Sequence, residues 1–317
     1  MSPGHGSSSG TTVIFRYEAG KLRTLTAGSG LQIRWVSWRR DGRLALAVGN
    51  KGLILTFDGK EFRRLESPTR ENLRCASYDS ANQALIVGNR GTMVRLNDGR
   101  ITSLQVGTEA NLRRVKWSLD GSLALVVGNN GTALAWQAGN IRELSGAFNN
   151  LRSISWHPDG KHALVSGNYF GMSMVPCPTL YQHSRGETEL KALKTSEKTD
   201  LIGVEWKPDG EFALAVGYEV VWQEPRIFRW TNKDLELVPI SETGLYPTVV
   251  GWDPRGSYAL IGTGSPLPAG EGAVLEYRDG VIRKLHSSPY RITCIAWHPS
   301  EGYALIVGQT DARTFTT

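Results

Sequence analysis

The sequence contains seven copies of one pattern, in which an apolar segment ends on an aromatic residue and a second apolar segment ends on a glycine ten or eleven residues later. The aromatics are Trp38, Tyr78, Trp117, Trp156, Trp206, Trp252 and Trp297, and the glycines are Gly49, Gly88, Gly128, Gly167, Gly217, Gly262 and Gly308. Successive aromatics lie 39 to 50 residues apart. A unit of this size cannot bury both of its faces alone, so the pattern predicts units that stack on one another.

Each copy divides into four short apolar runs that are separated by turn residues. In the best-preserved copy, Leu112–Leu144, the turns are Asp120-Gly121, Asn129-Asn130-Gly131 and Ala138-Gly139. Asn, Asp and Gly tolerate the positive φ angles that tight hairpins require. One copy therefore predicts a four-stranded antiparallel sheet. Seven such sheets at this period predict an all-β, seven-bladed β-propeller.

The two ends of the chain together supply one complete blade. The seventh copy has its first two strands at Arg291–Gln309, and Thr12–Leu25 matches the outer half of a blade such as Gly91–Leu104. We expect the N-terminal strands to complete the last blade and close the ring, because closure removes exposed sheet edges. Residues 1–11 are expected to form a disordered tail, and residues 12–317 a single β-propeller domain.

Longer loops interrupt the pattern in the fourth to sixth copies. They cover Tyr169–Lys198, the segment around Gln223-Glu224-Pro225, and Ser265–Gly272. The stretch Glu187–Lys198 carries the one helix signal of the chain. Trp222 lies in the second of these loops, outside the repeated aromatic position. Binding specificity often resides in such loops, which makes them candidate contact surfaces.

The motifs at the end of the first strand resemble a known repeat family. Trp156–Gly160 reads W-H-P-D-G and Trp206–Gly210 reads W-K-P-D-G, and the second strand ends in G-N-x-G in several copies. Over nearly the whole chain these features resemble the WD-repeat family and its divergent prokaryotic relatives. The Gly-His and Trp-Asp hallmarks are missing, since Gln137 follows Trp136 where the family has aspartate. The resemblance implies a seven-bladed, non-enzymatic interaction platform.

Two residue types recur where the first strand begins and the second strand ends. The first four copies carry Arg34, Arg74, Arg113 and Arg152 four residues before the aromatic, and Asn50, Asn89, Asn129 and Asn168 after the glycine. The last three copies carry Ile202, Thr248 and Thr293, and then Tyr218, Thr263 and Gln309. Both positions share one face of the ring, here named the top face. We expect a crescent of arginines and asparagines at the channel mouth that can bind an anionic group.

Two structural interpretations of the crescent stay open beside this functional one. Arginines near a propeller axis can bond the carbonyl groups of neighbouring blades. Each asparagine can instead hold its turn in the left-handed αL conformation. Under either interpretation the residues serve the fold, and the direction in which the guanidinium groups point decides between the hypotheses.

Positive charge is concentrated in the first third of the chain. The net charge is +6, and residues 1–116 carry 19 Lys/Arg against 9 Asp/Glu, whereas the rest carries 17 against 21. This basic sector, which includes Arg39, Arg40 and Arg43, favours an acidic or phosphorylated protein partner through long-range attraction. Nucleic acid is a weaker candidate partner, because the sequence has no recognition helix, basic tail or RNA-binding sheet signature.

These features predict a non-catalytic protein-interaction scaffold that uses the top face and the basic sector. The alternative is a binder of an anionic ligand, either a phosphorylated group or nucleic-acid phosphate, at the channel mouth. A third hypothesis is a propeller-fold lyase or hydrolase with scattered catalytic residues drawn from His162, His183 and His286. The chain has no HExxH, Cys-x-x-Cys, P-loop or G-x-S-x-G motif, so we expect no catalytic residues, bound metal or cofactor.

Cysteine content and hydropathy bear on location. Of the three cysteines, Cys75 and Cys294 fall in predicted inner strands and are expected to be buried core residues without disulfides. No run approaches the roughly 18–20 apolar residues of a membrane-spanning helix. We therefore expect a cytoplasmic protein with no membrane span.

Overall fold

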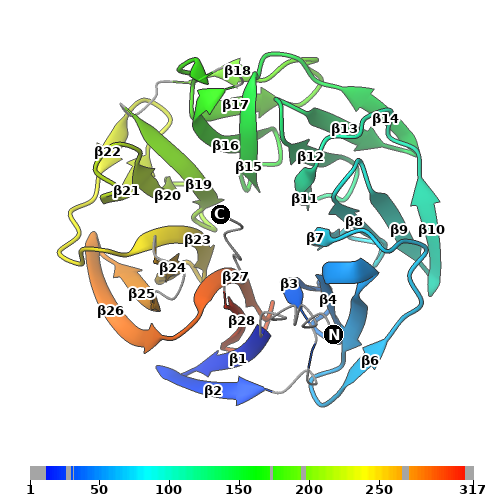
Figure 1. The fold of residues 1–317 in the computed structure, drawn as a ribbon, viewed down its shortest axis with the longest axis horizontal. Coiled ribbons are helices and arrows are strands. Elements are labelled where there is room, and N and C mark those ends of the chain that lie inside the picture. Colours follow the sequence, from blue (N-terminus) through cyan, green and yellow to red (C-terminus); the bar gives the residue numbers. More distant parts are fainter. Residues whose placement is uncertain are drawn as a thin grey trace, which may run out of the picture.

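Seven four-stranded antiparallel sheets form a ring in the computed structural model (Figure 1). The structure describes residues 12–25, 30, 32–171, 174–193, 198–265 and 271–310. The predicted tail at 1–11 lies outside the described residues. The prediction of an all-β, seven-bladed β-propeller is confirmed.

Each blade runs from an inner strand at the channel to an outer strand at the rim (Figure 1). The strands of blades one to three are β3 (Ile33–Trp38), β4 (Ala45–Gly49), β5 (Ile54–Phe57) and β6 (Phe62–Arg64); β7 (Leu73–Tyr78), β8 (Ala84–Gly88), β9 (Met93–Asn97) and β10 (Arg100–Leu104); and β11 (Leu112–Trp117), β12 (Ala124–Gly128), β13 (Ala133–Gln137) and β14 (Asn140–Glu143). A short 3₁₀ turn, η1 (Asn50–Gly52), follows β4.

The remaining four blades have the same order. Their strands are β15 (Asn149–Trp156), β16 (His162–Gly171), β17 (Leu180–Ser184) and β18 (Lys191–Ala192); β19 (Thr199–Trp206), β20 (Ala213–Glu219), β21 (Pro225–Trp230) and β22 (Leu235–Leu237); β23 (Tyr246–Trp252), β24 (Ala259–Gly264), β25 (Gly272–Arg278) and β26 (Val281–Ser288); and β27 (Arg291–Trp297), β28 (Tyr303–Gln309), β1 (Thr12–Glu18) and β2 (Lys21–Leu25). Every inner strand ends on the aromatic residue of its repeat, as the spacing predicted.

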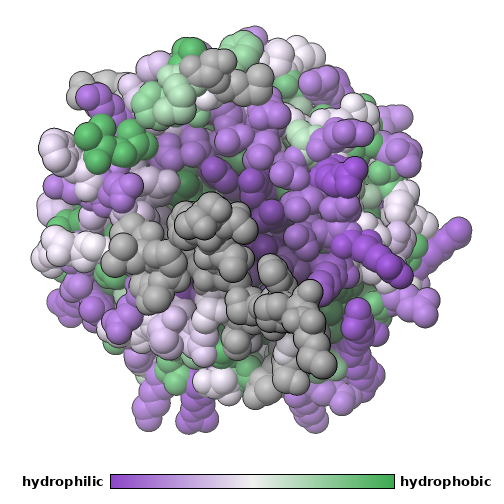
Figure 2. Space-filling model, viewed as in Figure 1, coloured by the Kyte–Doolittle hydropathy of each residue, from purple (hydrophilic) through white to green (hydrophobic). Residues whose placement is uncertain are grey.

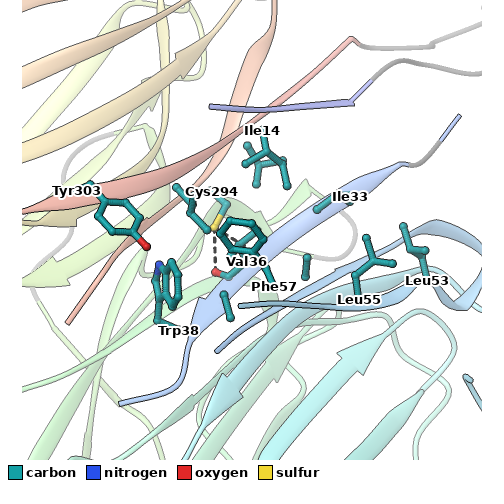
Figure 3. Close-up of a cluster of buried hydrophobic side chains, with 13 residues drawn as sticks. Ile14, Ile33, Val36, Trp38, Leu53, Leu55, Phe57, Cys294 and Tyr303 are labelled. Carbon is teal, nitrogen blue, oxygen red and sulfur yellow. Dashed lines mark hydrogen bonds between the residues drawn. The ribbon is translucent and has the colours of Figure 1, made fainter. Parts of the chain in front are cut away.

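The N-terminal strands complete the seventh blade, as the sequence predicted. β1 pairs with β28 in antiparallel register from Thr12↔Gln309 to Glu18↔Tyr303. Blade seven then packs on blade one through a buried cluster that includes Ile14, Cys294 and Val36 (Figure 3). The Cys294 thiol accepts from the Val36 N–H at 3.4 Å and donates to the Val36 carbonyl at 3.3 Å. The last blade is therefore assembled from both ends of the chain and closes the ring.

In four of the seven blades, the tryptophan that ends the inner strand is hydrogen-bonded to the preceding blade. The indole N–H groups of Trp38, Trp156, Trp252 and Trp297 donate at 3.0–3.3 Å to the carbonyl groups of Ala296, Lys116, Glu205 and Gly251. Each acceptor stands just before the aromatic of its own blade. A buried indole needs such a partner for its N–H, so these bonds stabilise the blade contacts.

The described part of Glu187–Lys198, which the sequence places in an inserted loop with a helix signal, contains the fourth strand of blade four. Leu190 is buried in the core between blades three and four, and Lys191–Ala192 forms β18 against β17. The Leu193 N–H extends this pairing by donating to the Leu180 carbonyl at 2.9 Å. Tertiary packing of Leu190 and the need for a fourth strand override the local helix propensity.

Candidate functional site

A β-bulge interrupts every inner strand at the same repeat position. The pairing between the first and second strands of each blade skips one residue, and the skipped residues are Arg34, Arg74, Arg113, Arg152, Ile202, Thr248 and Thr293. A bulge leaves the extra residue outside the ladder and changes the direction of its side chain. The seven bulges therefore set apart one residue per blade near the channel mouth at the top face.

In the first four blades, the bulged arginine is hydrogen-bonded to the asparagine that follows the second strand of the same blade. Nε–H of Arg74 donates to Oδ1 of Asn89 at 2.8 Å, and Arg113 donates to Asn129 at the same distance. The same bond joins the pairs Arg34–Asn50 and Arg152–Asn168. A guanidinium group is planar and rigid, so a bond at Nε fixes the direction of its two terminal nitrogens.

For Arg74 and Arg113, these contacts differ from both structural interpretations of the crescent. None of the four asparagines has a positive φ; the left-handed residue is the next one, at Lys51, Arg90 and Asn130, with φ of 53°, 50° and 56°. Within the described residues, Arg74 and Arg113 donate to the asparagine of their own blade and to no carbonyl group of a neighbour. The asparagines therefore serve to orient the arginines.

A second polar ring holds these turns from the neighbouring blade. Asn72, Asn111, Asn150 and Asp200 stand six residues before the aromatic of blades two to five, and each accepts a backbone N–H from the turn of the preceding blade, at Lys51, Arg90, Asn130 and Tyr169. The four distances are 2.7–3.1 Å. The crescent is thus built on turns that are fixed from both sides, which gives it a defined geometry.

The guanidinium groups of the crescent are partly buried and repel one another. Burial, followed by the charges of Arg34, Arg113 and Arg152, lowers the pKa of Arg74 from its ordinary value to about 9. Burial and the charges of Arg152, Arg114 and Arg34 lower the pKa of Arg113 to about 10. Both values lie well above 7, so the groups are charged at neutral pH while bearing a desolvation cost. This arrangement favours the entry of an anion.

The terminal nitrogens of three crescent arginines lack partners among the described residues. Arg74, Arg113 and Arg152 each make the Nε bond to asparagine and no ion pair with a carboxylate. Asp200 acts on Arg152 electrostatically, although the pKa of Arg152 is lowered overall by burial. In the outer basic sector, Arg39 pairs with Asp41 at 2.7 Å and Arg90 lies 3.8 Å from Glu71. The channel mouth differs in that three partly buried guanidinium groups lie together without a carboxylate partner among the described residues.

Arg114 is a further cation of this site that the sequence comparison did not single out. Its guanidinium carbon lies 4.0 Å from the centre of the Trp35 ring, and its Nε atom is buried without a hydrogen-bond partner among the described residues. The charge of Arg114 contributes to lowering the pKa of Arg74, Arg113 and Arg152. The sequence pattern does distinguish Arg114, because blade three alone has a charged residue three positions before its aromatic.

The other half of the mouth has different chemistry. The bulged residue is Ile202, Thr248 or Thr293, and the Thr248 hydroxyl donates to backbone carbonyls of Gly262 at 3.0 Å and of Ile292. Asp200 is buried, which raises the pKa of its carboxyl group, and it accepts from the Tyr218 hydroxyl at 3.2 Å. At the bulge, blades five to seven therefore offer an isoleucine and two threonines where blades one to four offer arginines. The same half of the mouth also carries the buried carboxylate of Asp200 and the guanidinium group of Arg291, whose charge acts on Arg152.

The top face combines this polar mouth with exposed apolar loops. Figure 2 shows hydrophilic side chains around a hollow near the centre, over the blades of β7, β11 and β15, and apolar patches over the blades of β17 and β21. The exposed fractions are 74% for Phe148, 69% for Met174 and 80% for Trp222. These residues lie before β15, after β16 and after β20, at the strand ends that define the top face.

A histidine cluster in blade four has the composition of a metal site but the geometry of a structural turn. Potential ligand atoms of His157, Asp159 and His162 lie within 4.8 Å of one another. The two imidazole rings are stacked at 4.5 Å and 20°, so their in-plane lone pairs do not converge on one ion. His157 Nε2 instead contacts the Gly210 carbonyl at 3.2 Å, as His298 contacts Gly42 at 2.9 Å. The cluster links neighbouring blades.

Several other sequence predictions can be placed on the structure. Cys75 and Cys294 are buried and unpaired, as expected. His162 and His183 lie on the paired strands β16 and β17 of blade four, where His162 packs against Trp206 and His183 is fully buried beside Trp156. His286 lies in blade six and contacts the Gly20 carbonyl at 3.0 Å, so the three histidines of the enzyme hypothesis do not form one cluster. The described residues include no helix with the length and apolar character needed to cross a membrane.

Comparison with known proteins places the fold. No family model matches the sequence, and no curated protein matches it. Among solved structures, the β-propeller domain of Cps50 (Swd1) from Myceliophteria thermophila is similar, with a TM-score of 0.66 and 12% sequence identity. The match covers 92% of this chain and 99% of that chain. At this identity the likeness shows the fold alone: the chain is a seven-bladed β-propeller, similar in architecture to the Cps50 domain.

Proposed function

We propose that this propeller is a non-catalytic interaction platform in the cytoplasm, and that its channel mouth binds an acidic or phosphorylated group of a partner protein. The observation that carries the proposal is the set of terminal guanidinium nitrogens on Arg74, Arg113 and Arg152, which have no partner in the described structure. Membership of the WD-repeat family, in its divergent prokaryotic form, is part of the same proposal and rests on the repeat motifs.

The chemistry of the mouth selects for an anion. Three desolvated cations repel one another, and a bound anion would remove that repulsion while accepting charge-assisted hydrogen bonds. The arginines come from three successive blades of a seven-fold ring, so they approach a central group from directions separated by about 50°. A tetrahedral phosphoryl group accepts bonds from several such directions, whereas a carboxylate accepts mainly in its own plane.

A protein is favoured as the source of the anion because of the surface around the mouth. Exposed Phe148, Met174 and Trp222 lie on the same face as the arginines. Apolar side chains beside a charged centre are typical of protein-binding surfaces. Nucleic acid would be expected to use a long basic track, and here the outer basic sector is interrupted by arginines that are paired with carboxylates, as in Arg39–Asp41 and Arg63–Glu61.

The test uses three pools of degenerate peptides with phosphoserine, glutamate or serine at a fixed central position. We expect the propeller to retain the phosphoserine pool most strongly, the glutamate pool less, and the serine pool least. Arg74→Gln and Arg113→Gln should each weaken retention of the phosphoserine pool by about tenfold, as loss of a hydrogen bond to a charged group predicts.

Arg100→Gln is the matched control, because Arg100 is exposed on β10, the outer strand of the same blade as Arg74. It removes the same charge from the protein and should leave retention unchanged. Equal retention of the three pools by the unaltered protein would show that the mouth does not recognise anionic side chains. A salt-sensitive preference for single-stranded DNA over all three pools would assign the mouth to nucleic acid instead.

A further inference from the structure

The loop between β20 and β21 presents the most exposed large apolar side chain among the described residues. Trp222 is 80% exposed, and Val221 beside it is 54% exposed. An exposed tryptophan contributes nothing to the core, and such residues are enriched at the centres of protein interfaces. The loop lies at the top face, because it follows the second strand of blade five.

A buried carboxylate holds this loop in one conformation. Glu219 is buried, and its Oε2 atom accepts the backbone N–H groups of Val221 at 3.0 Å and Trp222 at 2.5 Å. The Glu219 N–H donates to the Glu224 carbonyl at 2.8 Å and closes the base of the loop. A loop that is already ordered loses little conformational entropy when a partner binds. Trp222 is therefore a preorganised contact residue.

Direct contacts connect the loop to the last arginine of the crescent. Arg152 donates to Asn168, whose amide nitrogen donates to Oδ2 of Asp200 at 2.7 Å. Asp200 also accepts from the Tyr218 hydroxyl at 3.2 Å. Tyr218 lies near the end of β20 and follows Gly217, in the repeat position that asparagine occupies in blades one to four.

The connection continues from Tyr218 to the base of the Trp222 loop. The rings of Tyr218 and Tyr246 are stacked with centroids 4.7 Å apart and planes 17° apart. The Tyr246 hydroxyl donates to Oε1 of Gln223, the residue after Trp222. Arg152 and the loop that carries the exposed indole are thus linked by one chain of contacts at the top face, with an aromatic pair in it.

Charge gives this part of the top face a direction. Its crescent end carries Arg74, Arg113 and Arg152, which have no carboxylate partner among the described residues. At blade five, Asp200 and Glu219 are buried and hydrogen-bonded, and Glu224 is paired with Arg226 at 2.8 Å, so the anionic group of a partner is favoured at the crescent. The complementary segment has its anion at the crescent and an apolar side chain at blade five.

We infer that one linear segment of a partner protein occupies both parts of the top face, with its anionic group at Arg74, Arg113 and Arg152 and an apolar side chain against Trp222. This inference rests on the proposed function and adds a second recognition element to it. Recognition by two elements is more selective than the charge alone, because a segment that lacks the apolar residue at the right spacing loses part of its binding energy.

The test is selection of random twelve-residue peptides displayed on phage, carried out in parallel on the unaltered protein and on Trp222→Ala. We expect the unaltered protein to enrich peptides in which acidic residues and an aromatic or aliphatic residue occur at a constant spacing. On Trp222→Ala the acidic residues should remain enriched and the apolar residue should not. A synthetic peptide selected on the unaltered protein should bind Trp222→Ala about tenfold more weakly or worse.

Leu237→Ala is the control, because Leu237 is also exposed in blade five but lies on its outer strand, β22. It should bind the selected peptide as the unaltered protein does, and thermal unfolding should show all variants folded. Acidic enrichment without a spaced apolar residue, or equal affinity for Trp222→Ala, would overturn the inference and leave the proposed function standing. Absence of acidic enrichment, together with unchanged binding by Arg74→Gln, would overturn the proposed function itself.

Discussion

The Nε–H group of Arg74 donates to Oδ1 of Asn89 at 2.8 Å, and this bond turns a structural repeat into a candidate site. Asn89 is neutral, so it orients the guanidinium group without neutralising its charge. The same relationship in four successive blades concentrates positive charge at one side of the channel mouth. The arginine–asparagine bonds and the closure of the ring therefore both have consequences for stability and binding.

Replacing the orienting amide by a carboxylate should stabilise the fold and abolish anion binding. Asn89→Asp combined with Asn129→Asp keeps the acceptor atoms for Arg74 and Arg113 and adds two negative charges among mutually repelling cations. We expect Tm to rise by a few degrees and retention of phosphoserine peptides to fall at least tenfold. Calorimetry and the peptide assay measure the two effects. A lower Tm with unchanged peptide retention would show that repulsion among the arginines is not significant.

Two similarly buried tryptophans should contribute differently to stability, because only one of them forms a hydrogen bond to the preceding blade. Trp156 and Trp117 are equally buried at the same repeat position, but only the Trp156 indole has an acceptor, the Lys116 carbonyl at 3.1 Å. Trp156→Phe should therefore reduce the free energy of unfolding by about 1 kcal/mol more than Trp117→Phe. Denaturant unfolding compares the two variants, and equal losses would mean that the indole bond adds nothing.

Acid should weaken the interface between blades three and four. Burial lowers the pKa of His183 from its ordinary value of 6.5, so the folded state binds fewer protons than the unfolded chain. The resulting stability is fully present above pH 6.5 and is lost as the pH falls below that value. His183→Leu should flatten the dependence of Tm on pH between 7 and 5. An unchanged dependence of Tm on pH in His183→Leu would show that His183 is not the group responsible.

Removal of the N-terminal strands should open the ring. Deleting residues 1–25 exposes the edge of β28 and the buried faces that pack on Ile14, Phe15 and Tyr17. An unpaired apolar edge promotes association, so sedimentation velocity should show oligomers or aggregates. Deleting only residues 1–11 should leave a species that sediments like the full chain. A monomeric, equally stable protein after the longer deletion would contradict the closure of blade seven by β1 and β2.

The ring was predictable from the sequence because the same pattern of strands and turns is repeated seven times. Turn residues such as Asp120-Gly121 and the aromatic that ends each inner strand are local features, and the N-terminal segment matched the missing half of a blade. The position of the arginines and asparagines at one face followed from strand direction alone. These parts of the structure depend on pattern rather than on the details of packing.

The pairing inside the site was not predictable in the same way. A β-bulge cannot be recognised from amino-acid composition, so the bond between Arg74 and Asn89 was not predictable. The sequence also did not indicate that the αL residue of the turn is Arg90 and not Asn89. The contact of Asp200 with Asn168 crosses from blade five to blade four and depends on three-dimensional packing. The strand within Glu187–Lys198 was not predictable from local propensity either, because it depends on the burial of Leu190, which is a tertiary effect.

The most direct test of the proposed anion site is the change in Tm produced by phosphate relative to chloride at constant ionic strength. It is measured for the unaltered protein, for Arg74→Gln/Arg113→Gln, and for the outer-strand control Arg23→Gln/Arg100→Gln. A site predicts a saturating increase in Tm for the first and third proteins and none for the second, whose Tm in chloride should be equal or higher. The same increase in all three proteins would show that phosphate acts on the whole surface, and that the channel mouth is not an anion site.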